Sequence, residues 1–174
     1  MKTIILSLLS IVALGFVIPE SVRIPVQHAT TADWNPRSFW YYPWGRSGTH
    51  KGIDIFAQQG TPVLAASSGL VLKTGYDEMG GNFIWMLSAK WRVHYYAHLA
   101  SSSARTGQLL KAGTIIGAVG TTGNAQGKAP HLHYAIRSLF PLIHQLDRTA
   151  PQAWHKMFFV NPDPLLREAS LKHE

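Results

Sequence analysis

Histidine is the residue type in this sequence with the most chemical potential. The chain has nine histidines and no cysteine. Disulfides and thiolate zinc sites are therefore excluded, and any metal site would use histidine and carboxylate ligands. A histidine also exchanges protons near neutral pH without special tuning. Five of the histidines fall in a segment rich in short apolar runs: His50, His94, His98, His131 and His133.

The first pair of candidate ligands is separated by four positions, in the run His50-Lys51-Gly52-Ile53-Asp54. Residues 50, 52 and 54 of an extended chain share one face. The His50 imidazole and the Asp54 carboxylate can therefore converge, and both are ordinary zinc ligands. A simple histidine–aspartate hydrogen bond at the start of a strand would use the same spacing.

The second pair is His131-Leu132-His133, an H-x-H sequence. On a strand both imidazoles point to one face, roughly 7 Å apart. A single zinc ion, which binds each nitrogen at about 2 Å, would be strained to use both. We therefore expect one ligand and one neighbour that faces the reacting water. Two packed histidines on a half-exposed strand are the alternative.

The third group lies in the run RVHYYAHL, at residues 92–99. As an extended strand it would place His94, Tyr96 and His98 on one face. We expect His98 to reach a groove at the end of this strand. Tyr96, His94 and Asn82 are expected to line or support the same substrate groove.

Two imidazoles and one carboxylate, with a fourth position left for water, form a common catalytic zinc site. His50, Asp54 and one histidine of the H-x-H pair could supply these ligands. The chain has no H-E-x-x-H motif, so the usual helical glutamate base is missing. A histidine is the natural substitute.

The elements that must position these residues are predicted to be strands. From residue 50 onward, short apolar runs alternate with glycine and proline turns, which predicts a mainly β, single small domain. We expect antiparallel sheets that form a groove, with few short helices. Gly80-Gly81-Asn82 predicts a turn. Short helices are expected over residues 142–148 and after Pro164. A chain of 174 residues with 46% hydrophobic residues fits one globular domain.

Five segments then resemble, in order, the core of the lysostaphin/LytM-type zinc endopeptidases, peptidase family M23. The likeness is clearest from about residue 50 to residue 136. The segments are HKGIDIFAQQGTPVLAASSGLV, GGNFIWML, HYYAHL, GTTGNAQGKAPHLHYAI and FVNPDPLL.

The resemblance implies that His50, Asp54 and His133 bind Zn²⁺ and that His98 and His131 form the catalytic pair. Either of these two could be the general base. It implies a zinc-dependent endopeptidase that hydrolyses peptide cross-links of bacterial peptidoglycan, with the peptide stems as its partner. The bond that is cut stays open. The alternative is a catalytically weak LytM-like domain that binds or activates another cell-wall hydrolase, but all five positions are filled here.

The N-terminus predicts export. Lys2 precedes an apolar run over residues 4–19, which is typical of a signal peptide and short for a spanning helix of about 20 residues. We therefore expect a signal peptide or inner-membrane anchor over residues 1–20, an N-terminal arm over residues 21–49 and an M23-type peptidase domain over residues 50–174. The location would be the periplasm or cell envelope.

The charge of the chain adds little to this hypothesis. The formal net charge is +7 with neutral histidines, which suits a polyanionic partner. There is no block of five or more like charges, and no motif supports a nucleic-acid partner. The sequence does not indicate an obligate protein partner.

Overall fold

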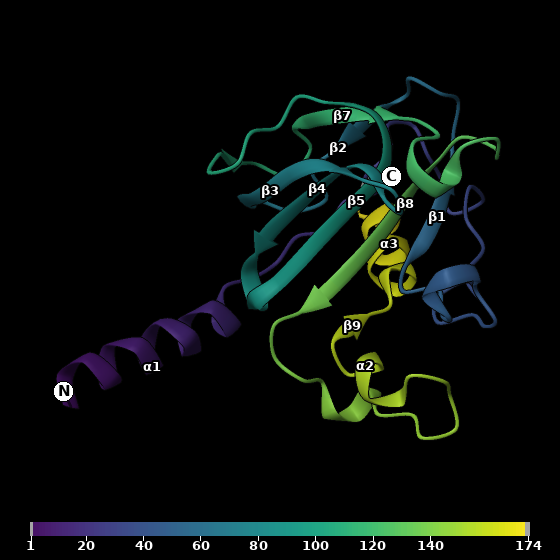
Figure 1. The fold of residues 1–174 in the computed structure, drawn as a ribbon. Coiled ribbons are helices and arrows are strands. Elements are labelled where there is room, and N and C mark those ends of the chain that lie inside the picture. Colours follow the sequence, from purple (N-terminus) through teal and green to yellow (C-terminus); the bar gives the residue numbers. More distant parts are fainter. Residues whose placement is uncertain (1, 173–174) are drawn as a thin grey trace.

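A computed structural model describes residues 2–172. Within these residues, nine strands form one antiparallel sheet (Figure 1). The main strand order is β1-β8-β5-β4-β3-β6, with β7 paired to β2 and β5, and β9 paired to β8. The strands are β1 Ile53–Phe56, β2 Pro62–Leu64, β3 Gly69–Asp77, β4 Gly81–Ser88, β5 Arg92–Ser102, β6 Leu109–Leu110, β7 Ile115–Val119, β8 His131–Ser138 and β9 Phe159–Val160.

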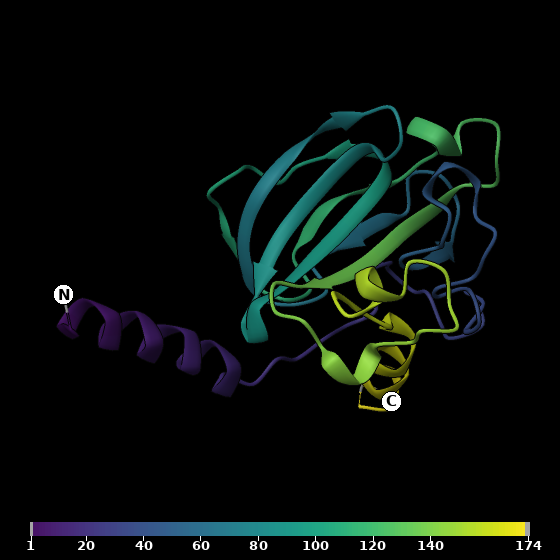
Figure 2. The ribbon, with the colours of Figure 1, turned by 60° about the horizontal axis from the view of Figure 1, so that its bottom comes forward.

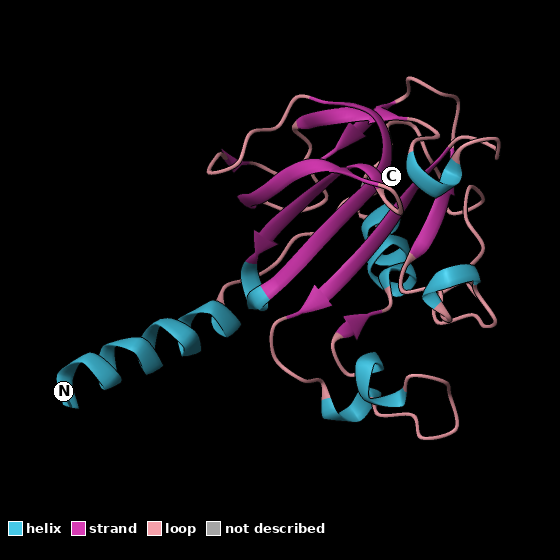
Figure 3. Cartoon of the chain, viewed as in Figure 1, coloured by secondary structure: helices cyan, strands magenta, loops and turns pink. Residues whose placement is uncertain are grey.

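Helices are few, as Figure 3 shows, which confirms the predicted mainly β fold. The α-helices are α1 Lys2–Val17, α2 Ala153–Lys156 and α3 Pro162–Leu171. The 3-10 turns are η1 Gly45–Ser47, η2 Ala89–Trp91, η3 Gly123–Ala125 and η4 Ile143–Gln145. α1 extends away from the sheet, whereas α3 lies against it (Figure 2). No helix in residues 2–172 combines the length and apolar character needed to cross a membrane.

The core lies on one face of the long strands, as the alternation of β8 illustrates. Leu132, Tyr134 and Ile136 are fully buried, while the residues between them point to the other face, as expected for a pleated strand. Leu166 of α3 joins the same core cluster. The core side therefore holds β8 in place and leaves its opposite face free to form a site.

The segment of residues 21–49, expected to be an N-terminal arm, has little regular structure, and several of its residues are part of the core. Val26 and Trp34 are buried in the main cluster, and Val26 bridges to Val63 of β2. The Trp34 indole nitrogen donates to Asp163 Oδ1 at 2.7 Å. The arm is thus fastened both to the sheet and to α3.

The predicted local elements hold with shifted bounds. The turn between β3 and β4 is present, but Gly81 and Asn82 already belong to β4. The helix expected over residues 142–148 is only the 3-10 turn η4. The C-terminal helix begins at Pro162, earlier than predicted, because the Asn161 side chain accepts the Asp163 backbone N–H and caps it.

Candidate active site

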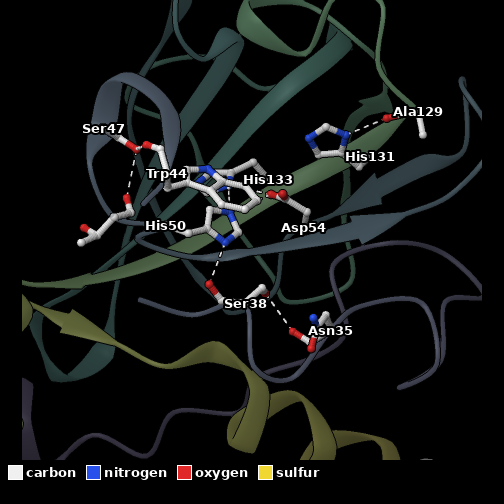
Figure 4. A network of polar contacts seen from close by, with 10 residues as sticks. Asn35, Ser38, Trp44, Ser47, His50, Asp54, Ala129, His131 and His133 are labelled. Carbon is white, nitrogen blue, oxygen red and sulfur yellow. Dashed lines mark hydrogen bonds and ion pairs between the residues drawn. The ribbon is translucent and has the colours of Figure 1, made fainter. Parts of the chain in front are cut away.

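Three of the predicted site residues meet at one edge of the sheet. Asp54 on β1 pairs directly with His133 on β8, and His50 approaches from the segment just before β1. Asp54 Oδ1 lies 2.8 Å from His133 Nδ1 and 3.0 Å from His50 Nε2. The two histidine nitrogens are 3.1 Å apart. Figure 4 shows this group in close-up.

The His50 ring is fixed by contacts with the arm of residues 21–49. Its Nδ1 lies 3.0 Å from the Ser38 carbonyl oxygen. A carbonyl can only accept, so Nδ1 carries the proton and Nε2 presents its lone pair to the group. Trp44 stacks on the same ring with centroids 4.3 Å apart, and His50 is only 1% exposed. The arm therefore sets both the tautomer and the orientation of this imidazole.

This group fits a metal ion by its donor chemistry. The three ligand atoms lie within 4.8 Å of one another. Three nitrogen or oxygen ligands at about 2.0–2.1 Å on tetrahedral corners would be about 3.3 Å apart, close to the separations seen here. Burial raises the pKa of the Asp54 carboxyl, but its close contacts with His133 and His50 outweigh this effect and hold that pKa far below its usual range. Asp54 is therefore a carboxylate, the form that binds metal.

The other two predicted histidines lie beside this group. His131 Nδ1 donates to the Ala129 carbonyl at 2.7 Å, and His98 Nδ1 donates to the Thr122 carbonyl at 3.0 Å. The rings of His98 and His131 have centroids 5.0 Å apart. Figure 4 shows His131 set apart from the His50–Asp54–His133 group. Each histidine therefore has a fixed tautomer, and its Nε2 has no hydrogen-bond partner among residues 2–172.

A β-bulge brings His98 to this face. Between Asn82 and Ile84, β4 advances by two residues while β5 advances by three. His98 lies in the bulge with a φ of 64°, in the left-handed region that non-glycine residues seldom adopt. The bulge breaks the alternation of side chains, so His98 lines the same cleft as Tyr95 and Ala97.

The surroundings of His98 favour its neutral form. Burial, together with the neighbouring His133 and His131, lowers the pKa of His98 to about 4. The ring is therefore uncharged near neutral pH, with the Nε2 lone pair available.

Two of the expected groove residues lie on the opposite face, which corrects the sequence prediction. Tyr96 is fully buried in the core, and its hydroxyl accepts the Ala66 N–H at 2.9 Å. His94 is also fully buried, with Nδ1 at 2.6 Å from the Tyr134 hydroxyl. Regular alternation along residues 92–99 would have kept these residues beside His98, and the bulge separates them.

Asn82 does not line the cleft either. Its side-chain nitrogen donates to the Leu99 carbonyl at 3.0 Å, and its backbone N–H donates to Thr122 Oγ1 at 3.0 Å. Asn82 therefore ties β4 to the segments on both sides of His98. It supports the bulge and does not form part of the groove wall.

The cleft has a volume of about 690 Å³, and it includes aromatic residues that the sequence prediction missed. Tyr95 packs edge-on against His133 with ring centroids 6.1 Å apart, and Trp44 covers His50. Burial and then the charge of Asp77 raise the pKa of Tyr95, so its hydroxyl keeps its proton. The sequence could have identified Tyr95 as a cleft residue only if the bulge had been recognised. Trp44 gave no such signal, because it lies in an arm without periodicity.

The sequence of this chain matches a known protein family and several of its members. Residues 48–146 match the family model of Peptidase family M23. The peptidoglycan DD-endopeptidase ShyC of Vibrio cholerae is 36% identical over 125 residues, which cover 71% of this chain and 28% of that relative. This chain therefore corresponds to less than a third of that relative's length.

The fold of this chain also matches solved structures of peptidases. The catalytic domain of lysostaphin from Staphylococcus simulans matches with a TM-score of 0.62 and 30% identity, over 79% of this chain and 95% of that chain. A zinc-containing peptidase from Vibrio cholerae matches with a TM-score of 0.55 and 28% identity, over 67% of this chain and 36% of that chain. The chain belongs to peptidase family M23.

Proposed function

We propose that this chain is a zinc-dependent endopeptidase that hydrolyses peptide cross-links of bacterial peptidoglycan. The observation that carries the proposal is the arrangement in one cleft of the His50–Asp54–His133 group and the histidine pair His98 and His131. The relative ShyC is itself named a peptidoglycan DD-endopeptidase. All five positions are present, which favours an active enzyme over a domain that only activates another hydrolase.

The metal would be held by His50, Asp54 and His133. When bound, zinc lowers the pKa of a water ligand to about 7 and polarises a carbonyl group. The Ser38 carbonyl on His50 and the packing of Tyr95 on His133 keep these two rings aimed at the ion. Such supporting contacts raise the affinity of a metal site because the ligands need no reordering.

His98 and His131 would move the protons. Each donates from Nδ1 to a backbone carbonyl, so each can take a proton on Nε2, and the carbonyl then stabilises the resulting imidazolium. One histidine accepts the proton of the attacking water and returns it to the leaving amine. The other, when protonated, donates to the oxygen of the tetrahedral intermediate. The geometry allows either residue to take either role.

The location follows from the substrate. Peptidoglycan lies outside the cytoplasm, so we propose that residues 1–20 act in export, as a signal peptide or an anchor, and that residues 50–174 carry the peptidase activity. The arm of residues 21–49 would accompany the exported domain, since Val26 and Trp34 complete its core.

The test is the digestion of purified sacculi. The muropeptide profile should show loss of cross-linked peptides with the metal-loaded protein, no change after chelation, and recovery when zinc is restored. The bond cut is read from the products. Intact sacculi, together with cleavage of unrelated peptides, would instead identify a peptidase with another substrate.

A further inference from the structure

The cleft continues beyond the metal group along β8. His131, His133, Ala135 and Arg137 occupy every second position of this strand, and all four line the cleft. Arg137 lies four residues beyond His133, which is about 13 Å along a strand. Ala135, between them, has a small side chain that is buried and lines the same cleft.

The Arg137 side chain has no partner within the described part of the protein. It is exposed, and among residues 2–172 this side chain makes no hydrogen bond or ion pair. Two other arginines are paired: Arg92 with Glu20 and Arg167 with Asp163. The guanidinium of Arg137 therefore keeps all five donors available to a ligand in the cleft.

A second cation lies at the same end. Lys51 lies two residues before Ile53, the first residue of β1, and Ile53 pairs with Tyr134 of β8. Lys51 also lines the cleft. Its ammonium donates to the Ser47 carbonyl at 3.0 Å, which holds the side chain in place.

The carboxylates that line the cleft already have other partners, so they do not neutralise these cations. They are Asp54 and Asp77. Asp54 is bound to the two ligand histidines, and Asp77 Oδ1 accepts the N–H groups of Met79 and Gly80 in the β3–β4 turn. The Arg137 end of the cleft is therefore positively charged and open.

We propose that Arg137, together with Lys51 of the same cleft, binds a carboxylate of the peptidoglycan stem peptide. This inference rests on the proposed function. A peptide lying extended along β8 would place such a carboxylate about four residues from the bond that is cut. The planar guanidinium matches a carboxylate with two parallel hydrogen bonds. The enzyme would then select anionic stem peptides over neutral glycine bridges.

The test uses the zinc-loaded protein and a set of cross-linked muropeptides. One substrate has free carboxylates, a second is amidated at D-glutamate, and a third is amidated at the diamino acid. The wild type should cleave the free acid with a kcat/KM about tenfold above one of the amidated forms, the loss expected for one charge-assisted contact. Which amide causes the loss identifies the carboxylate that is bound.

The variants decide whether Arg137 is responsible. Arg137→Ala should bring the ratio of the two kcat/KM values to about one, and Arg137→Lys should keep part of it because the charge remains. Arg105→Ala is the matched control, since Arg105 is exposed and lies outside the cleft. This control should leave the ratio as in the wild type.

Three results would overturn the inference. These are equal cleavage of the free-acid and both amidated substrates by the wild type, an unchanged ratio in Arg137→Ala, and faster cleavage of a pentaglycine bridge than of the free acid. Each of them still requires an active wild type. Failure of the wild type on every substrate would instead contradict the proposed function, so the two failures are distinct.

Discussion

At the scale of single residues, backbone carbonyls fix the tautomer of three imidazoles in the site. His50, His98 and His131 all donate from Nδ1 to a carbonyl oxygen, so their Nε2 atoms face the cleft as acceptors. His133 instead uses Nδ1 toward Asp54. In the proposed site, the division between ligands and proton carriers therefore follows from position, because only His50 and His133 contact Asp54.

The division of roles predicts that metal binding and catalysis can be separated. Asp54→Asn should remove most of the bound zinc and the activity, because the neutral amide is a poor metal ligand. His98→Ala should keep about one zinc per chain while lowering kcat by roughly 10²–10⁴-fold, the usual contribution of a general acid or base. Metal analysis and a muropeptide assay on the same samples measure both effects. Asp147→Asn on the surface serves as the control, and loss of zinc from His98→Ala would show that His98 is a ligand.

At the scale of elements, the β-bulge that contains His98 depends on a close approach between the loop before β8 and the β3–β4 turn. A side chain at Gly123 would place its Cβ against the Gly81 backbone nitrogen and 2.7 Å from the Met79 carbonyl oxygen. Gly123 directly follows Thr122, whose carbonyl orients His98. The loop before β8 and the β3–β4 turn thus together hold the His98 ring in place.

Gly123→Ala should therefore destabilise the fold by at least about 3 kcal/mol, through backbone strain and the clash together. Gly127 lies in the same loop with a φ of 78°, but a Cβ added there would have no atom within 4 Å. Gly127→Ala should cost only the strain of about 1–2 kcal/mol. Urea unfolding of both variants measures the difference, and equal costs would show that the close approach is unimportant.

A second element-level device fastens Glu20, the residue just before the arm, to the back of the sheet. The Glu20 carboxylate is buried, pairs with Arg92 at 2.6 Å and contacts His94 at 3.0 Å and Ser88. Burial raises the pKa of Glu20, but hydrogen bonds from His94 and Ser88 and the charges of His94 and Arg92 give a net lowering. His94, which strand alternation alone would place in the groove, has this structural role.

This lowered pKa predicts how stability depends on pH. The folded state holds the Glu20 carboxylate more strongly than the unfolded chain does, so its contribution is complete above about pH 4.5 and is lost as the pH falls through the folded-state pKa. Glu20→Gln should cost about 2 kcal/mol at pH 7 and should flatten the loss of stability below pH 4.5. Denaturant unfolding from pH 7 to pH 3 tests this, and parallel curves for wild type and variant would refute it.

At the scale of the whole molecule, the proposed metal connects parts of the chain that are distant in sequence. Its ligands come from the arm side of β1, from β1 itself and from β8, 83 residues from His50 to His133. An ion that binds only the folded state stabilises it by mass action. The metal should therefore act as a cross-link as well as a catalyst.

Zinc at about 100 times its Kd should raise the melting temperature by roughly 5–10 °C, from about 2.7 kcal/mol of linkage in a chain of this size. Calorimetry of the metal-free protein with and without zinc gives the shift. Asp54→Asn should show almost none of it. A similar shift in that variant would place the stabilising ion elsewhere.

The sequence by itself determined the candidate ligand types, the strand-rich fold and the separation of the H-x-H pair, because these depend on local spacing and on the period of a strand. Only the tertiary structure decided which residues near His98 face the cleft. A bulge on β5 depends on its pairing with β4, so the alternation that placed Tyr96 and His94 in the groove fails there. The tertiary structure also decided that Trp44 covers His50, because the arm has no periodicity that would place it, whereas Arg137 follows the alternation of His131 and His133 along β8.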